Sequence, residues 1–192
     1  TAQLTPDDIQ EFNAILAKAS LKTKGRLILI GDVLADRGSN DYWTLKVLEL
    51  LSRLGISVEI LLSNHDSTFI EATELQKDYQ PPHPNQFNAS MVNLQKLIKM
   101  KLVDIKEVNA LAQQIYKPML KALSYSLATD QKSVTLYSHA AIGLNTIKTI
   151  AAVLELKYSD ATPMALCKSI DAINAEFRTF VQNKQVYELY RE

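Results

Sequence analysis

The segment Gly31-Asp32-Val33-Leu34-Ala35-Asp36-Arg37-Gly38 directly follows the apolar run Leu27-Ile28-Leu29-Ile30. A short apolar run that ends at glycine is typical of a central strand in a parallel sheet, and we predict this strand near residues 26–31. Ligands of open α/β sheets bind at the carboxyl ends of such strands. Asp32 is therefore a candidate metal ligand, and Arg37 offers the planar set of donors that matches a pair of phosphate oxygens.

Two further predicted strands are also followed by polar side chains. One is predicted near residues 57–63 and precedes Asn64 and His65, and the other is predicted near residues 133–138 and precedes His139. Taken alone, Asn64 is better explained as a helix cap, and His65 and His139 as core histidines with satisfied hydrogen bonds. Oxygen and imidazole side chains at three strand ends favour instead a divalent metal used in hydrolysis.

Helical periodicity in the rest of the chain predicts an α/β fold, a sheet core flanked by helices. The first two strands and the helix between them predict a βαβ unit. Residues 67–130 predict a helical cap insertion whose last helix extends to Leu123, and a helical C-terminal part follows the third strand. We expect residues 1–192 to form a single, partial domain. Helices are predicted to begin at Thr5, Asn40, Asn145 and Thr162.

In their order along the chain, the three polar clusters resemble those of the calcineurin-like metallophosphatases, and within them the phosphoprotein phosphatase branch. That family carries the blocks G-D-x-H, G-D-x-x-D-R-G, G-N-H-E and, later, H-G-G. The corresponding segments here are Gly31-Asp32…Asp36-Arg37-Gly38, Ser63-Asn64-His65-Asp66 and Ser138-His139-Ala140-Ala141. The resemblance covers residues 20–145, and the ordered set is more specific than any single block.

The resemblance implies a role for each of these side chains. Asp32 would bridge two divalent metal ions (Mn, Fe or Zn), and Asn64 and His139 would be ligands of the second ion. His65 would protonate the leaving alcohol, with Asp36 as the carboxylate that orients it. These roles describe one edge of a phosphatase active site.

The implied reaction is direct attack of a metal-activated water on phosphorus, without a phosphoenzyme. Arg37 and Asn64 would hold the phosphoryl oxygens of a phosphoprotein carrying phosphorylated Ser, Thr or Tyr, or of a small phosphomonoester. The form Leu34-Ala35-Asp36-Arg37-Gly38-Ser39-Asn40-Asp41 also resembles phosphatases that intracellular bacteria deliver into host cells. The expected location is the cytoplasm, or a host cell into which the protein is secreted.

Four departures from the family pattern limit this comparison. No Asp-x-His block stands before the first strand, no histidine follows His139, and Ala140 and Ala141 replace glycines. The spacing between Asp32 and Asp36 is one residue longer than in the family. The chain alone therefore retains ligands for about one metal ion. Two interpretations stay open: an incomplete portion of an active metallophosphatase, and a catalytically silent scaffold or partner-binding remnant.

Composition argues against several other classes of protein. The 21 Lys and Arg residues balance 21 Asp and Glu residues, so nothing indicates a nucleic-acid surface. No apolar run approaches the ~18–20 residues that span a bilayer. The single cysteine, Cys167, excludes an internal disulfide and suits a reducing compartment. Ile173 stands where a cysteine-phosphatase loop needs arginine, so Cys167 is interpreted as a buried thiol.

Some neighbouring polar residues receive structural interpretations. Asp66 is predicted to cap a helix or to hold a neighbouring ligand rather than to bind metal. His83 lies in the proline-rich segment 81–84 and is interpreted as a solvated loop residue. For residues 31–38 the structural alternative is a helix-capping turn with a surface ion pair.

Overall fold

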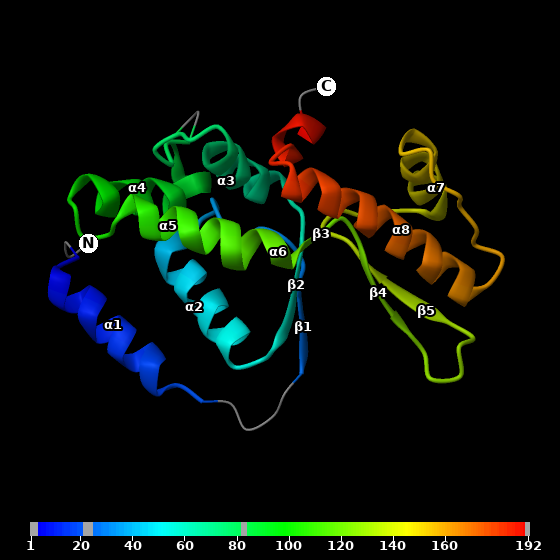
Figure 1. The fold of residues 1–192 in the computed structure, drawn as a ribbon, viewed down its shortest axis with the longest axis horizontal. Helices are drawn as coiled ribbons and strands as arrows, with labels where there is room; N and C mark the ends of the chain where they lie inside the picture. Colours follow the sequence, from blue (N-terminus) through cyan, green and yellow to red (C-terminus); the bar gives the residue numbers. More distant parts are fainter. Residues whose placement is uncertain (1–3, 21–24, 82–83, 191–192) are drawn as a thin grey trace.

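A parallel sheet lies at the centre of the chain (Figure 1). A computed structural model describes residues 4–20, 25–81 and 84–190. The strands are ordered β1-β2-β3, with β1 at Arg26–Leu29, β2 at Ser57–Leu61 and β3 at Leu120–Lys121. The crossover from β1 to β2 contains α2, at Asp41–Arg53, which confirms the predicted βαβ unit.

The third predicted strand is present but belongs to a second sheet. β5, at Val134–Tyr137, pairs antiparallel with β4, at Ser124–Leu127, and β3 takes the third place in the parallel sheet. The connection explains this pairing, because residues 128–133 are enough for a hairpin whereas a parallel crossover needs a dozen residues or more. The expected single sheet is therefore corrected to two.

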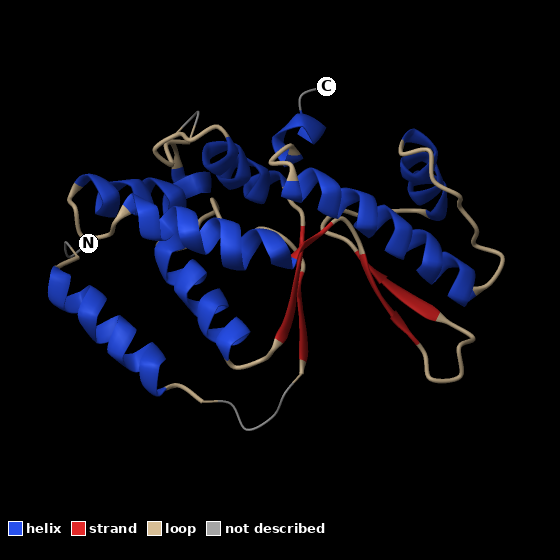
Figure 2. Ribbon diagram, viewed as in Figure 1, coloured by secondary structure: helices blue, strands red, loops and turns tan. Residues whose placement is uncertain are grey.

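Helices surround the parallel sheet on the left of Figures 1 and 2. They are α1 (Pro6–Lys18), α3 (Asn64–Glu74), η1 (Gln86–Asn88), α4 (Ala89–Lys99), α5 (Ile105–Leu111), the π-helical η2 (Ala112–Tyr116) and α6 (Lys117–Met119). The helix predicted to extend to Leu123 ends at Met119, because Leu120 is extended and pairs with Ile60 of β2. Residues 67–130 thus also contribute β3 and β4, and their role as a cap insertion stays a prediction.

A second group of helices, α7 (Leu144–Val153) and α8 (Pro163–Gln182), shares an apolar cluster with the β4–β5 hairpin. The last helix, η3 (Val186–Tyr190), packs against α3 and α8 instead. One face of α8 is buried, at Leu166, Ile170, Ile173, Phe177 and Val181, and Cys167 is buried as predicted. α7 begins at Leu144 after Gly143, so the expected cap at Asn145 was wrong.

The other predicted helix starts are confirmed by hydrogen bonds. The Thr5 hydroxyl accepts the N–H of Asp8, and the Asn40 side chain accepts the N–H of Tyr42 at 2.9 Å. Thr162 caps α8 in the same way. Each cap satisfies a backbone donor that the first turn leaves free.

Glu59 of β2 joins the two sheets. Its carboxylate accepts two hydrogen bonds from Arg26, each 2.9 Å long, and one of 2.6 Å from the Ser124 hydroxyl. Lys121 lies 3.0 Å away, and Arg26 also donates to the carbonyl of Tyr125. Burial would raise the pKa of Glu59, but these donors outweigh it and lower the pKa to about 2.

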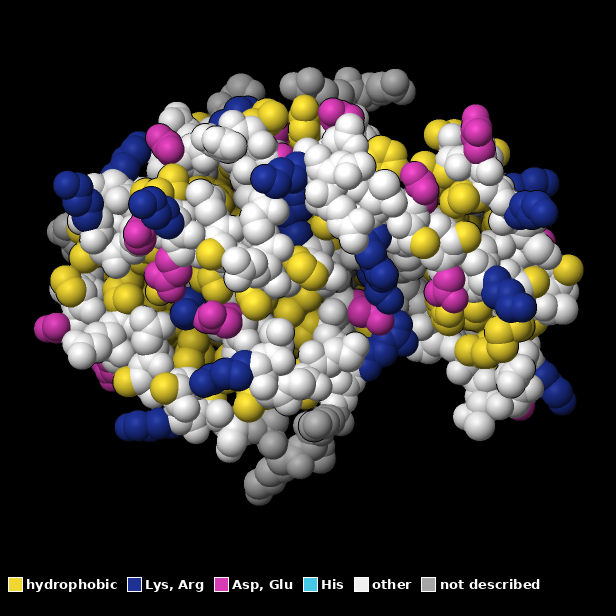
Figure 3. Space-filling model, in the orientation of Figure 1, with side chains coloured by type: hydrophobic (Ala, Val, Ile, Leu, Met, Phe, Trp, Pro, Cys, Tyr) yellow, Lys and Arg dark blue, Asp and Glu magenta, His cyan; other side chains and the backbone are white. Residues whose placement is uncertain are grey.

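The face of the molecule seen in Figure 3 shows no single dominant charge. Lys and Arg side chains are mixed with Asp and Glu over the face in Figure 3, which is hollowed between the lower end of β1 and the β4–β5 hairpin. Among the residues described, no helix is long and apolar enough to span a bilayer.

Candidate active site

The site lies beyond the ends of β1 and β2, and a glycine determines its geometry. Gly31 has a φ of 75°, in the left-handed region that glycine tolerates best. A Cβ atom on Gly31 would lie 2.4 Å from Nδ1 of His139 and 2.8 Å from Cβ of Ser63. A residue without a side chain is therefore needed for the His139 ring to approach the end of β1.

The buried carboxylate of Asp66 holds the loop that follows Gly31. It accepts the N–H groups of Leu34 at 3.1 Å and Val33 at 3.4 Å, and the hydroxyls of Tyr116 at 2.7 Å and Ser63 at 2.6 Å. Burial raises the pKa of Asp66, and these hydrogen bonds oppose the rise. The interpretation of Asp66 as a residue that supports its neighbours is confirmed.

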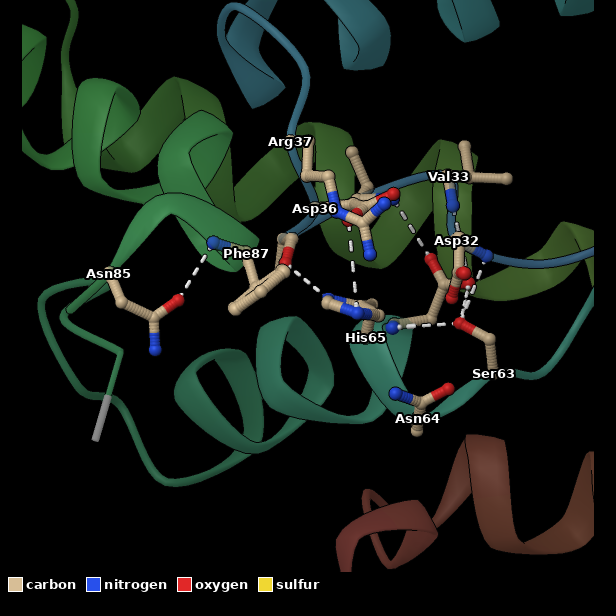
Figure 4. Close-up of polar contacts among 12 residues, drawn as sticks. Asp32, Val33, Asp36, Arg37, Ser63, Asn64, His65, Asn85 and Phe87 are labelled. Atoms are coloured by element: carbon tan, nitrogen blue, oxygen red, sulfur yellow. Dashed lines mark hydrogen bonds and ion pairs between the residues drawn. The ribbon is translucent and has the colours of Figure 1, made fainter. Parts of the chain in front are cut away.

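Ser63 links this loop to α3. Its hydroxyl oxygen accepts the N–H of Asp32 and the N–H of Asp66, both at 3.0 Å. The second bond makes Ser63 the N-cap of α3, so Asn64 and His65 stand on the first turn of that helix, at the edge where β1 ends. One hydroxyl thus sets the relative position of Asp32 and of both polar residues that follow β2 (Figure 4).

Asp32, Asn64 and His139, three predicted metal ligands from distant segments, meet at this edge. Nε2 of His139 lies 3.2 Å from Oδ1 of Asn64 and 3.6 Å from Oδ1 of Asp32. Nδ1 of the same ring lies 3.0 Å from the carbonyl oxygen of Ile30. Ligands that share one ion at about 2.1 Å are roughly 3 Å apart, close to the spacing seen here.

The hydrogen bond to Ile30 determines how the ring of His139 is protonated. A carbonyl only accepts hydrogen bonds, so neutral His139 carries its proton on Nδ1 and directs the lone pair of Nε2 at Asp32 and Asn64. Three electron-pair donors then face one another, an arrangement that a cation, or protonation of the ring, stabilises. Carboxylate, amide and imidazole are suitable donors for Mn, Fe or Zn, so these residues fit the expected ion.

Asn64 is essential to this donor set. Within the described part of the chain, no group of three or more His, Cys, Asp and Glu side chains could hold a metal ion. A metal at this edge would therefore use the amide oxygen of Asn64 beside Asp32 and His139. That these three side chains hold about one metal ion stays a prediction.

His65 and Asp36 form the adjoining half of the site. Nδ1 of His65 lies 2.9 Å from the carbonyl oxygen of Ala35, and Nε2 lies 3.8 Å from Oδ1 of Asp36. That Asp36 oxygen is buried and has no hydrogen-bond partner in the described structure. The hydrogen bond that orients the ring therefore comes from Ala35, while the Asp36 carboxylate lies within ion-pair range of Nε2.

Arg37 lies at the rim of the site. Its side chain is 68% exposed, and its Nε atom is 3.7 Å from Oδ1 of Asp36. The guanidinium stands over the ring of Phe87, 5.0 Å from its centroid. Figure 4 shows Arg37, Asp36 and His65 beside one another, with Asp32 and Asn64 further along the same edge.

The predicted site residues thus come together as two adjoining clusters, Asp32–Asn64–His139 and Asp36–Arg37–His65. His83 lies outside the described residues. No role was predicted from the sequence for Ser63, Asp41 or Phe87. The pattern Ser63-x-x-Asp66 before an apolar helix is a capping signal that could have identified Ser63. No comparable pattern marks the other two residues.

By fold and by family, the chain is a phosphatase domain. It belongs to the family described as "WipA-like, phosphatase domain", whose profile matches residues 26–192. It is also similar to the crystal structure of the phosphatase domain from the Legionella effector WipB, with a TM-score of 0.88 and 36% sequence identity. The match covers 96% of this chain and 62% of the WipB chain, so this chain spans less than two thirds of that length. No curated protein matches the chain.

Proposed function

We propose that this domain is a metal-dependent phosphomonoesterase of the phosphoprotein phosphatase type. The observation that carries the proposal is the convergence of Asp32, Asn64 and His139, with Nε2 of His139 facing two oxygens at 3.6 and 3.2 Å. Membership in a phosphatase-domain family supports a phosphorylated substrate. The ligand types support a divalent metal such as Mn, Fe or Zn.

The residues of the two clusters would have different roles in the proposed reaction. A bound metal would supply polarisation of a phosphoryl oxygen and an activated water. Asp32, Asn64 and His139 would hold it, and the exposed guanidinium of Arg37, together with the Asn64 amide, would bind phosphoryl oxygens. A bond from a water oxygen to phosphorus forms while the bond to the leaving oxygen breaks.

His65 would supply the proton for the leaving group. The Ala35 carbonyl keeps one proton on Nδ1, so the acid is the imidazolium, and Nε2 gives the proton that the leaving oxygen takes. The Asp36 carboxylate, 3.8 Å from Nε2, stabilises the imidazolium before transfer. The products are an alcohol or phenol and inorganic phosphate.

We propose a phosphoprotein with phosphorylated Ser, Thr or Tyr as the substrate, with small phosphomonoesters as the alternative. The similar Legionella protein is an effector, which supports the same origin for this domain and action on proteins of a host cell. In the complete enzyme two divalent ions would take part, and the residues described here supply ligands for about one of them.

The second candidate function is a catalytically silent scaffold or partner-binding domain. It is favoured by the small ligand set, in which Asp32 and His139 are joined by an amide rather than by a third His, Cys, Asp or Glu among the described residues. This candidate predicts at most one weakly bound metal per chain and no hydrolysis.

Hydrolysis of p-nitrophenyl phosphate by the full-length protein with Mn²⁺ separates the two functions. We expect turnover that EDTA abolishes and that Asp32→Asn and His65→Asn each reduce at least 100-fold. The matched control is Glu59→Gln, which changes a buried carboxylate at the junction of the two sheets. This variant should keep most activity. Full activity in both site variants would refute the mechanism.

A further inference from the structure

Ala35 occupies an uncommon backbone conformation at the centre of the site loop. Its φ is 56°, in the left-handed region that is unfavourable for a residue other than glycine, and its side chain is fully buried. It belongs to the segment between Asp32 and Asp36 that is one residue longer than in the resembled family. The extra length is therefore accommodated where the chain turns at Ala35.

Both backbone polar groups of Ala35 are bound by side chains. Its N–H points at the carboxylate of Asp41, 3.1 Å from each oxygen, and its carbonyl accepts from Nδ1 of His65 at 2.9 Å. Asp41 is the first residue of α2 and is 1% exposed. A single residue thus connects a buried carboxylate to the ring of the proposed acid.

Helix capping does not account for the burial of Asp41. The first turn of α2 is capped by Asn40, which accepts the N–H of Tyr42. A buried carboxylate is unfavourable unless it has specific partners, and both oxygens of Asp41 lie within hydrogen-bond distance of the N–H of Ala35. From this geometry we infer that Asp41 is a positioning residue for His65, holding Ala35 so that its carbonyl keeps the proton of neutral His65 on Nδ1 and Nε2 directed into the site.

The groups around Asp41 make this arrangement sensitive to its charge. Burial, together with the nearby carboxylates of Asp66 and Asp36, raises the pKa of Asp41 to about 7, while the neighbouring Ser90 hydroxyl and the N–H of Ala35 oppose the rise. Ser90, in the first turn of α4, also donates its backbone N–H to the carbonyl of Asp36 at 2.9 Å. The two-oxygen acceptor that holds Ala35 is complete when Asp41 is ionised.

The direct test is the tautomer of His65, read from imidazole ¹⁵N chemical shifts of the metal-free full-length protein at pH 8. We expect the Nδ1–H form in the wild type and a mixture of both tautomers in Asp41→Ala. His139 provides an internal control, because its Nδ1 contacts the Ile30 carbonyl and its signals should not change. Glu59→Gln should leave both histidines as in the wild type.

An unchanged His65 tautomer in folded Asp41→Ala would overturn the inference. Should that variant not fold, the isosteric Asp41→Asn takes its place. An Nε2–H tautomer of His65 in the wild type would contradict the Ala35 contact and would also overturn the inference. This test needs no turnover, so it stands apart from the proposed hydrolysis.

Asp41 should also contribute to the rate of hydrolysis, an expectation that rests on the proposed function. Asp41→Asn should lower kcat about 10-fold and Asp41→Ala about 100-fold, with KM nearly unchanged, because Asp41 contacts His65 only through Ala35. The acidic limb of the kcat–pH profile should also shift in Asp41→Asn. Loss of activity with an unshifted profile and a raised KM would indicate a merely structural role and would overturn the inference.

Discussion

The ring of His139 lies 3.2 Å from the amide oxygen of Asn64, although the two residues are 75 positions apart in the sequence. His139 follows β5 of the hairpin sheet, and Asn64 begins α3 after β2 of the parallel sheet. The site therefore forms only when the two sheets pack together. Glu59, in the middle of β2, also joins the two sheets through hydrogen bonds from Arg26 and Ser124.

Gly31→Ala should disrupt the contact between His139 and Asn64. The added methyl group would stand 2.4 Å from Nδ1 of His139, and a φ of 75° strains any residue other than glycine. We expect the affinity for Mn²⁺, measured by calorimetry, to fall at least 10-fold. Gly143→Ala is the control, because nothing lies within 4 Å of its added Cβ atom. Equal affinity in the two variants would show that Gly31 does not position His139.

Phe87→Leu tests whether the aromatic ring positions Arg37. A cation–π contact at an exposed site contributes about 0.5–1 kcal/mol, so its loss should raise KM for p-nitrophenyl phosphate roughly 2–5-fold with kcat unchanged. Phe12→Leu removes an aromatic contact with Trp43, away from the site, and should leave KM as it is. A fall in kcat at constant KM would instead assign Phe87 to the chemical step.

The raised pKa of Asp41 predicts a pH dependence of stability. The folded state keeps the proton of Asp41 up to about pH 7, whereas the unfolded chain loses it near 3.8, so the wild type becomes less stable as pH rises between these values. Relative to Asp41→Asn, its free energy of unfolding should fall by up to about 1.4 kcal/mol per pH unit. Urea denaturation of both proteins at pH 4.5, 6 and 7.5 measures this difference. If the difference in free energy of unfolding between the two proteins is the same at all three pH values, the raised pKa of Asp41 is contradicted.

Glu59 should show the opposite dependence. Its pKa is about 2 in the folded protein, below the ordinary value of 4.5, so its stabilising effect is present above pH 4.5 and is lost as pH falls towards 2. The stability advantage of the wild type over Glu59→Gln should therefore be smaller at pH 3 than at pH 6 in urea denaturation. If the free energies of unfolding of the two proteins change equally with pH, the hydrogen bonds from Arg26 and Ser124 do not lower the pKa of Glu59.

Local signals in the sequence predicted many of these elements. Thr5, Asn40 and Thr162 each cap the helix expected, because capping depends on residues within one turn. The strands after Gly25 and Gly55 were predicted from short apolar runs. The pairing of β5 was not predicted, because a run of alternating residues does not identify the partner strand, and β3 is only two residues long.

The sequence predicted most residues of the candidate site, but it did not predict several of the contacts between them. The order of polar clusters indicated Asp32, Asn64 and His139, and these converge. The Ala35 carbonyl and the buried Asp41 depend on a left-handed turn that no residue type in the segment signals, since alanine rarely adopts it. Backbone groups have no signature in the sequence, so the partner of His65 became visible only in the structure.

The central claim is that the converging donors of Asp32, Asn64 and His139 bind a divalent metal. Titration of the metal-free protein with Mn²⁺, followed by the loss of the free-ion signal in electron paramagnetic resonance, tests it directly. We predict at least one Mn²⁺ per wild-type chain, affinity at least 10-fold lower in Asp32→Asn and in His139→Ala, and unchanged binding in Glu59→Gln. No binding by the wild type, or equal binding by all four proteins, would contradict the claim.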